Sequence, residues 1–373
     1  RSYNLIWNEW FRDQNLQDSV TVDKNDSADT VTDYVLLKRG KRHDYFTSCL
    51  SNPQKGDTAI SLPLGTTAPI QASGDLELTN QTDGDRTLYM FTGGASLNYG
   101  GATSTVGDAV RYADGLQADL SSATAATINA IRLAVTTQQF LERDARGGTR
   151  INEIIKSHFN VTVPDYRVQR PEYLGGGSSL VNVSPIPQTS ESNTTPQGTM
   201  SAFATASVSG GGFTKAFTEH GHVICLANVR ADLTYAKGLH KMFSRQTRYD
   251  FYWPEFNHIG EQAVLQQEIE LTDPAAGTND DVFGYQERYA DYRFLPSRIS
   301  AQFRPQHSAS LDPWILTEEL SGPSLSATFI ESNTPMDRVL AVSSQPDFIL
   351  DCYFDIKAVR PMPLRGEPGL ARF

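Results

Sequence analysis

The chain has 373 residues, with 32 basic and 43 acidic side chains and a formal net charge of -11. The length allows a large core but leaves the domain count open, because β-sandwiches with long loops often exceed the usual domain size. The acidic balance excludes a surface that wraps nucleic acid over its whole extent, so any DNA contact is local or shared with a basic partner. No apolar run approaches the roughly 20 residues of a membrane span, and the start of the sequence lacks a secretion signal.

The first stretch has the apolar spacing of an amphipathic helix, with Tyr3, Ile6, Trp7, Trp10 and Phe11 on one face. Ser2 is the expected N-cap. The stretch that follows, residues 18–33, is expected to be a solvated loop with an acidic run at residues 23–33. It is not a calcium loop, because Ala28 stands where the turn requires glycine and Tyr34 where the bidentate glutamate belongs.

Residues 56–107 are rich in Gly, Thr, Ser and Asn, with short alternating pieces such as DLELTNQT and RTLYMFTGG. This composition predicts an excursion from the core. Helices are expected over residues 122–146, ending at Gly147 and Gly148, and again from Ile151 until Pro164.

The second half of the chain is predicted to be mainly extended. Residues 175–212, rich in Gly, Ser, Thr and Pro, predict a surface arm. Branched and aromatic residues predict strands in four places, at residues 222–236, 298–304, 338–344 and 348–361. Strands scattered among long loops favour a β-sandwich whose loops carry contacts to neighbours.

The three cysteines, Cys49, Cys225 and Cys352, are far apart and odd in number. This pattern argues against disulfides and predicts buried thiols in a reducing cytoplasm.

No residue is predicted to be catalytic, to bind a cofactor or to bind a metal. Glu219, His220 and His222 lack a third and fourth metal ligand nearby. The two glycine triplets are not followed by the Lys and Ser/Thr of a phosphate loop, and there is no GxSxG, HExxH or CxxC motif. Adjacent acids such as Glu318 and Glu319 point apart and cannot flank one bond.

Three runs combine aromatic rings with arginine, at residues 1–20, 244–271 and 282–304. Large rings beside guanidinium groups are typical of protein interfaces. The interface candidates are Trp7, Trp10, Arg248, Tyr249, Tyr252, Trp253, Arg288 and Tyr292. Core packing of these rings, or stacking on bases of single-stranded DNA, are the alternatives.

These runs, with RSYNLIWNEWFRDQ at the start, LERDARGGTRINEIIKSHFNVTVPDYRVQRPEYLGGGSS (141–179) and DRVLAVSSQPDFILDCYFDIKAVRPMPLRGEPGL (337–370), resemble the major capsid protein of microviruses, in particular gokushoviruses. The resemblance implies a mainly β chain: one jelly-roll domain over residues 1–373, with long insertions and a few helices. It also implies a non-enzymatic subunit of a T=1 icosahedral shell around circular single-stranded DNA, assembled in the bacterial cytoplasm. In the resembling family a further β-rich segment precedes the first motif, so we expect strands that this sequence lacks.

The resemblance further implies several partners: an internal scaffolding protein, a DNA pilot protein, a small basic DNA-binding protein and a host surface receptor. Residues 56–107 match by position the insertion loop at the threefold axes, with Asp83, Arg86, Tyr89 and Tyr99 as host-attachment candidates. The basic, proline-rich C-terminal stretch supplies the DNA-contact candidates Lys357, Arg360, Arg365 and Arg372. A tail that holds a neighbouring subunit explains this stretch equally well.

Two rival functions remain at this point. A phage glycan-binding or glycan-cleaving β-sandwich would use exposed aromatics on sugars and a carboxylate pair for hydrolysis. A non-viral single-stranded DNA-binding protein fits the net charge of -11 poorly.

Overall fold

The computed structural model describes residues 1–55, 128–273, 275 and 277–361, and the backbone of four strands within residues 70–118. The α-helices are α1 (Ser2–Ile6), α2 (Ile128–Gly147), α3 (Ile151–Phe159) and α4 (Ala327–Ile330). The strands are β1 (Ile70–Asn80), β2 (Gly84–Met90), β3 (Leu97–Tyr99), β4 (Val110–Ala118), β5 (Asn182–Pro187), β6 (Met200–Thr205), β7 (Glu261–Leu265) and β8 (Val282–Glu287).

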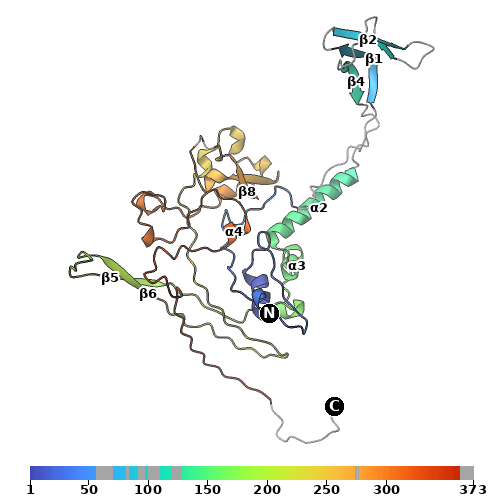
Figure 1. Ribbon diagram of the computed structural model, residues 1–373. Helices are drawn as coiled ribbons and strands as arrows, with labels where there is room; N and C mark the ends of the chain where they lie inside the picture. Colours follow the sequence, from blue (N-terminus) through green and yellow to red (C-terminus); the bar gives the residue numbers. More distant parts are fainter. Residues whose placement is uncertain are drawn as a thin grey trace, which may run out of the picture.

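The described strands form three antiparallel sheets. One has the order β3-β2-β1-β4, and the other two are the hairpins β5-β6 and β7-β8. Figure 1 shows the four-stranded sheet beyond the N-terminal end of α2 and the β5-β6 hairpin projecting away from the remaining chain. The predicted mainly β class is confirmed at this level, whereas the jelly-roll arrangement stays a prediction.

The predicted N-terminal helix is present, but its end is wider than an α-helix. A π-helical turn, Trp7–Phe11, follows α1, and the Arg12 amide donates to the Trp7 carbonyl at 2.9 Å. Ser2 lies inside the helix and Arg1 occupies the N-cap, so the predicted capping residue is wrong.

The two central helices are also confirmed. The predicted start of the first, residues 122–127, lies outside the described residues, and its end at Gly147 agrees with the glycine signal. The second helix ends before Pro164, because Asn160 adopts a left-handed conformation with φ of 54° and stops it. Asn tolerates this conformation better than most residues.

The strands predicted at residues 222–236, 298–304, 338–344 and 348–361 are not formed. The described residues in these segments make one β-pairing, an isolated parallel bridge between Tyr235 and Arg298. The predictions fail because β propensity selects side chains that fit a pleated surface, while a strand also needs a hydrogen-bonded neighbour.

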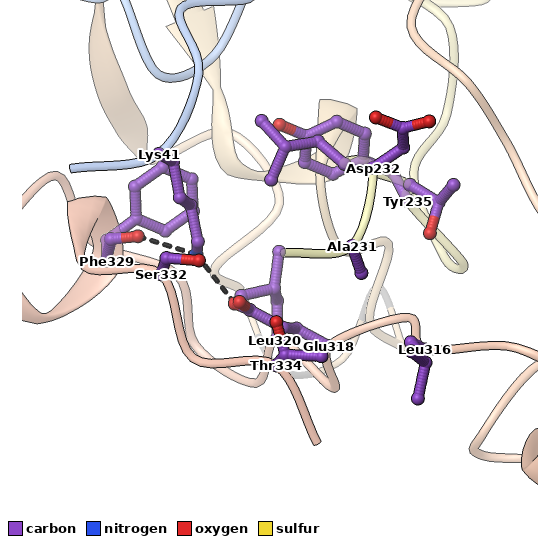
Figure 2. A pocket seen from close by; sticks show the side chains of 12 residues that line it. Lys41, Ala231, Asp232, Tyr235, Leu316, Glu318, Leu320, Phe329, Ser332 and Thr334 are labelled. Carbon is purple, nitrogen blue, oxygen red and sulfur yellow. Dashed lines mark hydrogen bonds and ion pairs between the residues drawn. The ribbon is translucent and has the colours of Figure 1, made fainter. Parts of the chain in front are cut away.

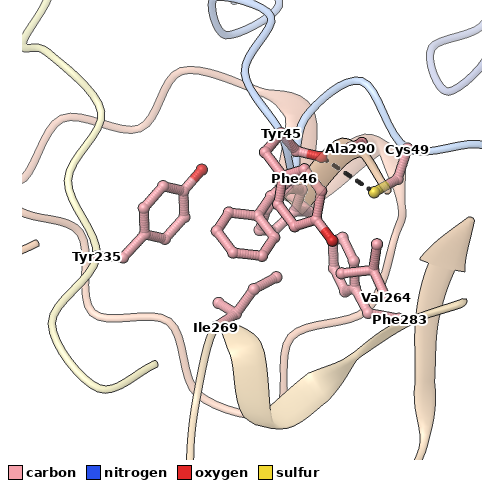
Figure 3. Close-up of a cluster of buried hydrophobic side chains, with 9 residues drawn as sticks. Tyr45, Phe46, Cys49, Tyr235, Val264, Ile269, Phe283 and Ala290 are labelled. Atoms are coloured by element: carbon pink, nitrogen blue, oxygen red, sulfur yellow. Dashed lines mark hydrogen bonds between the residues drawn. The ribbon is translucent and has the colours of Figure 1, made fainter. Parts of the chain in front are cut away.

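An aromatic core joins segments that are far apart in the sequence (Figure 3). It consists of Tyr45, Phe46, Cys49, Tyr235, Val264, Ile269, Phe283, Ala290 and Phe329. Phe46 is 1% exposed and packs edge-on against Tyr45 and Tyr235, with ring centroids 5.0 and 4.7 Å apart. Such edge-to-face pairs stabilise beyond the area they bury.

Asp44 fixes the turn that carries Phe46 into the core. Its Oδ1 accepts hydrogen bonds from the amides of Phe46 and Thr47 at 2.9 and 2.8 Å. Its Oδ2 accepts from the Tyr235 hydroxyl at 2.6 Å, which satisfies a polar group that the core would otherwise leave unpaired. The turn then runs to Leu50, which exchanges two backbone hydrogen bonds of 2.8 Å with Tyr285 of β8.

The cysteine prediction holds for one residue of three. Cys49 is buried in the core, and burial raises the pKa of its thiol. Cys225 and Cys352 are free and exposed, which corrects the prediction that they are buried. Both lie in the extended segments that formed no strand.

We expect Phe46→Ala to lower the free energy of unfolding by about 3–5 kcal/mol, because it empties the centre of the aromatic core. Urea unfolding followed by tryptophan fluorescence measures the change. Phe159→Ala is the matched control, since Phe159 is 73% exposed and its loss should cost within about 0.5 kcal/mol. Equal effects of the two substitutions would contradict the central place of Phe46.

Candidate subunit interface

Two neighbouring segments form a surface of aromatic rings and arginines, which we call the aromatic ledge. One segment carries the short 3-10 helices Arg248–Asp250 and Pro254–Phe256, and the other follows β8 and carries Ala290–Tyr292. The ledge consists of Arg245, Arg248, Tyr249, Phe251, Tyr252, Trp253, Phe256, Arg288, Tyr289, Asp291 and Tyr292.

Local hydrogen bonds shape the first segment. Asp250 Oδ2 accepts from the amides of Gln246 and Thr247 at 3.0 and 2.7 Å, and from the Thr247 hydroxyl. The Thr247 amide, followed by that of Gln246, lowers the pKa of this carboxyl. Pro254 starts the next turn, where its missing N–H is not needed. The sequence thus fixes two tight turns that present the rings between them.

Tyr289 ties the two segments together. Its φ of 62° places it in the left-handed region, and its side chain is buried. The hydroxyl accepts from the Trp253 amide at 3.2 Å and donates to the Phe251 carbonyl at 3.3 Å. The Tyr289 amide donates to Gln262 of β7 at 3.0 Å, so the anchor is fixed to the β7-β8 hairpin.

A buried ion pair supports the ledge from beneath. The side chains of Arg245 and Asp291 are 10% and 5% exposed and pair directly. Gln262 Nε2 donates to the other Asp291 oxygen at 2.8 Å. The Arg245 guanidinium lies 4.1 Å from the Tyr292 ring centroid, a cation-π distance. Asp291 therefore holds the arginine that supports an exposed ring.

The outer rings of the ledge are each about half exposed. They are Tyr249, Phe251, Tyr252, Trp253 and Tyr292. Tyr252 packs edge-on against Tyr289 at 5.0 Å, its amide donates to the Tyr292 hydroxyl at 3.2 Å, and Trp253 Nε1 donates to the Arg248 carbonyl at 2.8 Å. Rings held in this way lose little freedom when a partner covers them, as at binding hot spots.

Neither the potential metal ligands nor the hollow at Lys41 forms a second candidate site in the described part of the chain. Among them, no group of three or more His, Cys, Asp or Glu side chains is placed to hold a metal ion. His220 and His222 are exposed. In the hollow of Figure 2, Lys41 Nζ donates to Glu318 and to the Phe329 carbonyl at 2.6 and 2.7 Å, which assigns the ammonium a structural role.

Comparison with known proteins identifies the family. The profile of the family described as Capsid protein (F protein) matches residues 1–370. This chain belongs to the phage F capsid protein family. Its relatives include the protein named Capsid protein VP1 of Bdellovibrio phage phiMH2K, which is 50% identical over 99% of this chain and 72% of the relative. The protein of the same name from Chlamydia phage 1 is 39% identical over 100% of this chain and 74% of the relative. The Capsid protein VP1 of Spiroplasma virus 4 is 36% identical over 100% of this chain and 73% of the relative. The resemblance to microvirus capsid proteins is thereby confirmed.

As a member of the F capsid family, the chain is a structural protein of the virion capsid. Among the residues that the structure describes, no helix has the length and apolar character needed to cross a membrane.

The structure brings six of the predicted interface residues together on the ledge. The six are Arg248, Arg288 and the four exposed rings Tyr249, Tyr252, Trp253 and Tyr292. The Arg288 guanidinium lies 5.4 Å from the Tyr289 ring. The residues missed by sequence reasoning are Arg245, Gln262, Tyr289 and Asp291. All four lie within the quoted aromatic runs, but only spatial pairing distinguishes a buried anchor from an exposed ring.

Trp7 and Trp10 lie elsewhere, at the N-terminal helix. Trp7 is buried and donates to the Lys38 carbonyl at 3.1 Å. Trp10 is 40% exposed, donates to the Pro171 carbonyl at 2.9 Å, and has the Arg170 guanidinium 3.9 Å from its ring. Trp10 therefore presents a second ring-and-arginine surface, while Trp7 offers little area to a neighbour.

The remaining candidates fall on other parts of the F family chain. Lys357 and Arg360 are exposed on the extended C-terminal segment, whereas Arg365 and Arg372 lie outside the described residues. Arg86 and Tyr89 are on β2 and Tyr99 is on β3, with only their backbone described, and Asp83 lies outside the described residues.

We expect Asp291→Ala to destabilise the subunit by about 3–5 kcal/mol, because it leaves the Arg245 guanidinium buried without its carboxylate. Urea unfolding measures the loss. Asp351→Ala, at an exposed aspartate, is the matched control and should change stability by no more than about 0.5 kcal/mol. If the two variants unfold alike, the buried pair does not hold the ledge.

Proposed function

We propose that this chain is the major capsid subunit that self-assembles into a T=1 icosahedral shell enclosing circular single-stranded DNA. The aromatic ledge carries the proposal, because its rings are rigidly held and half exposed, as suits surfaces that neighbouring subunits cover. The shell is inferred to assemble in the bacterial host cytoplasm.

The accessible surface of the chain supports assembly. Among the described residues, the extended C-terminal segment leaves most of its large apolar side chains open to solvent. Large apolar side chains such as Ile349, Tyr353 and Val359 are more than nine-tenths exposed. A chain that functions alone in water rarely leaves this much apolar surface open, whereas contacts with several neighbours would cover it.

The net charge bears on how the shell would hold DNA. A subunit with 11 excess negative charges repels phosphates, so we infer that a small basic DNA-binding protein inside the shell contributes to their neutralisation. Lys357 and Arg360, exposed on the C-terminal segment, are proposed as local DNA contacts. An internal scaffolding protein during assembly and a DNA pilot protein in the particle complete the proposed partners.

We assign host attachment to the insertion that contains β1 to β4. The sheet occupies residues 70–118, so it continues beyond the excursion predicted at residues 56–107. Figure 1 places it away from the β7-β8 region, at the far end of α2. A projecting sheet at a threefold axis would present Asp83, Arg86, Tyr89 and Tyr99 to a bacterial receptor.

Sedimentation and electron microscopy of the native protein, followed by nuclease treatment, test the proposed function. Uniform small icosahedra that protect circular single-stranded DNA are the expected result. A monomer or small oligomer that protects no DNA and turns over a glycan would instead favour the glycan-cleaving alternative.

We expect Trp253→Ala to leave a soluble subunit but to abolish closed particles, because it removes a central ring of the ledge. Sucrose-gradient sedimentation separates the subunit from the shell. Trp314→Ala is the matched control, since Trp314 is 63% exposed and lies outside the ledge. A normal yield of intact shells from Trp253→Ala would remove the interface role of this ring.

Replacing residues 70–118 by a short Gly-Ser linker should spare assembly and abolish adsorption to host cells, because the sheet forms its own hydrogen-bonded unit. Particle yield and the fraction of particles bound to cells are measured together. Unchanged adsorption by intact particles would refute the receptor assignment.

A further inference from the structure

The β5-β6 hairpin has one wholly apolar face. Its register pairs Val183 with Ala204, Pro185 with Ala202, and Pro187 with Met200, and alternation places these six side chains on the same side. The opposite side carries the polar and apolar residues Asn182, Ser184, Ile186, Ser201, Phe203 and Thr205. All of these residues except Ser184 are exposed. A two-stranded hairpin with an exposed apolar face is marginal in water, so it calls for a covering partner.

The two edges of the hairpin differ in their ability to pair. The Gln188 amide donates to the Thr199 carbonyl at 2.9 Å, which fixes the alternation along both strands. The backbone groups of 183, 185 and 187 therefore point away from β6, and those of 200, 202 and 204 point away from β5. Because Pro185 and Pro187 have no N–H, the outer edge of β5 resists strand addition.

The outer edge of β6 is open by contrast. Met200, Ala202 and Ala204 each present an N–H and a C=O, and no hydrogen bond from another described segment reaches them. An open, flat and uncharged edge is a template for another strand.

We propose that β6 pairs antiparallel with β6 of a second copy of this chain, across a two-fold axis at Ala202. The product is a four-stranded sheet of order β5-β6-β6-β5. This contact rests on the proposed assembly of many copies and identifies one surface through which two of them meet.

Backbone geometry selects this register. Outward-pointing groups of one β6 bond only to outward-pointing groups of the other. Among the registers that allow this, only the one with Ala202 facing Ala202 and Met200 facing Ala204 pairs all three outward-pointing residues. In this register the two apolar faces lie on the same side of the new sheet and become continuous. A shift by one residue would set outward groups against inward ones and break the ladder.

Charge favours a second copy as the occupant. Two chains of net charge -11 repel one another over most of their surfaces, but residues 173–214 contain one charged side chain, Glu191. Neither β5 nor β6 carries a charge. An uncharged, self-complementary edge lets identical copies meet without juxtaposing like charges, and such pairing is isologous.

Cysteine cross-linking tests the contact. Facing residues in a hydrogen-bonded antiparallel pair have Cα atoms about 5.5 Å apart, within disulfide reach. Ala202→Cys is introduced into virions whose exposed Cys225 and Cys352 are replaced by serine. Mild oxidation and a non-reducing gel should then yield a covalent dimer from most subunits.

Asn182→Cys on β5 is the matched control. Three strand spacings of about 4.8 Å alone separate the two copies of this residue by about 14 Å, and they are also displaced along the strands, so no dimer should form. Intact shells without the Ala202→Cys dimer, or with equal dimer from Asn182→Cys, would overturn the contact and leave the proposed function standing. If the unsubstituted protein forms no particles, the proposed function fails and the contact fails with it.

Discussion

The packing of Phe46 between Tyr45 and Tyr235 is the interaction on which the rest of the described structure depends. It joins a turn near residue 45, a loop near residue 235 and the β7-β8 hairpin, which lie far apart in the sequence. Each of these segments is short, so none could bury its own apolar side chains. This core is nevertheless small, and many large apolar side chains of the described residues remain outside it. In the proposed assembly, neighbouring subunits would cover that surface, and association would then contribute to the stability of the folded chain.

The aromatic ledge inherits its rigidity from the same core. Ala290 belongs to the core and lies between the anchor Tyr289 and the buried Asp291, so the position of the ledge is set by packing beneath it. Glu268, also buried, accepts from Tyr45 and pairs with Lys241, just before the first ledge segment. Burial raises the pKa of this carboxyl, and the nearby Lys241 ammonium opposes the rise. A surface fixed in this way avoids much of the ordering cost that weakens association between flexible surfaces.

Sequence patterns predicted the features that depend on local spacing. The helical stripe at Tyr3 to Phe11 and the glycine stop at Gly147 were sufficient, because helix hydrogen bonds are local. The strands expected around Cys225 and Cys352 failed, because a strand is completed by a partner that the pattern does not specify. The aromatic runs predicted the exposed rings of the ledge but not the left-handed Tyr289 or the Arg245-Asp291 pair. Those depend on where β7 and β8 bring Gln262, which spacing along the chain cannot show.

Charge and hydrogen bonding together suggest why the surfaces of this subunit differ so much. A chain with 43 acidic residues stays dispersed at a distance, because copies repel one another. Association then requires surfaces on which few charges face each other, such as the ring cluster of the ledge and the uncharged β6 edge. The prolines of β5 close the other edge of the same hairpin, which would restrict growth to a single added hairpin and prevent an open-ended sheet. In the proposed assembly, long-range repulsion combined with a few geometrically limited contacts would favour a closed shell over disordered aggregation, since a closed symmetric arrangement satisfies every such contact at once.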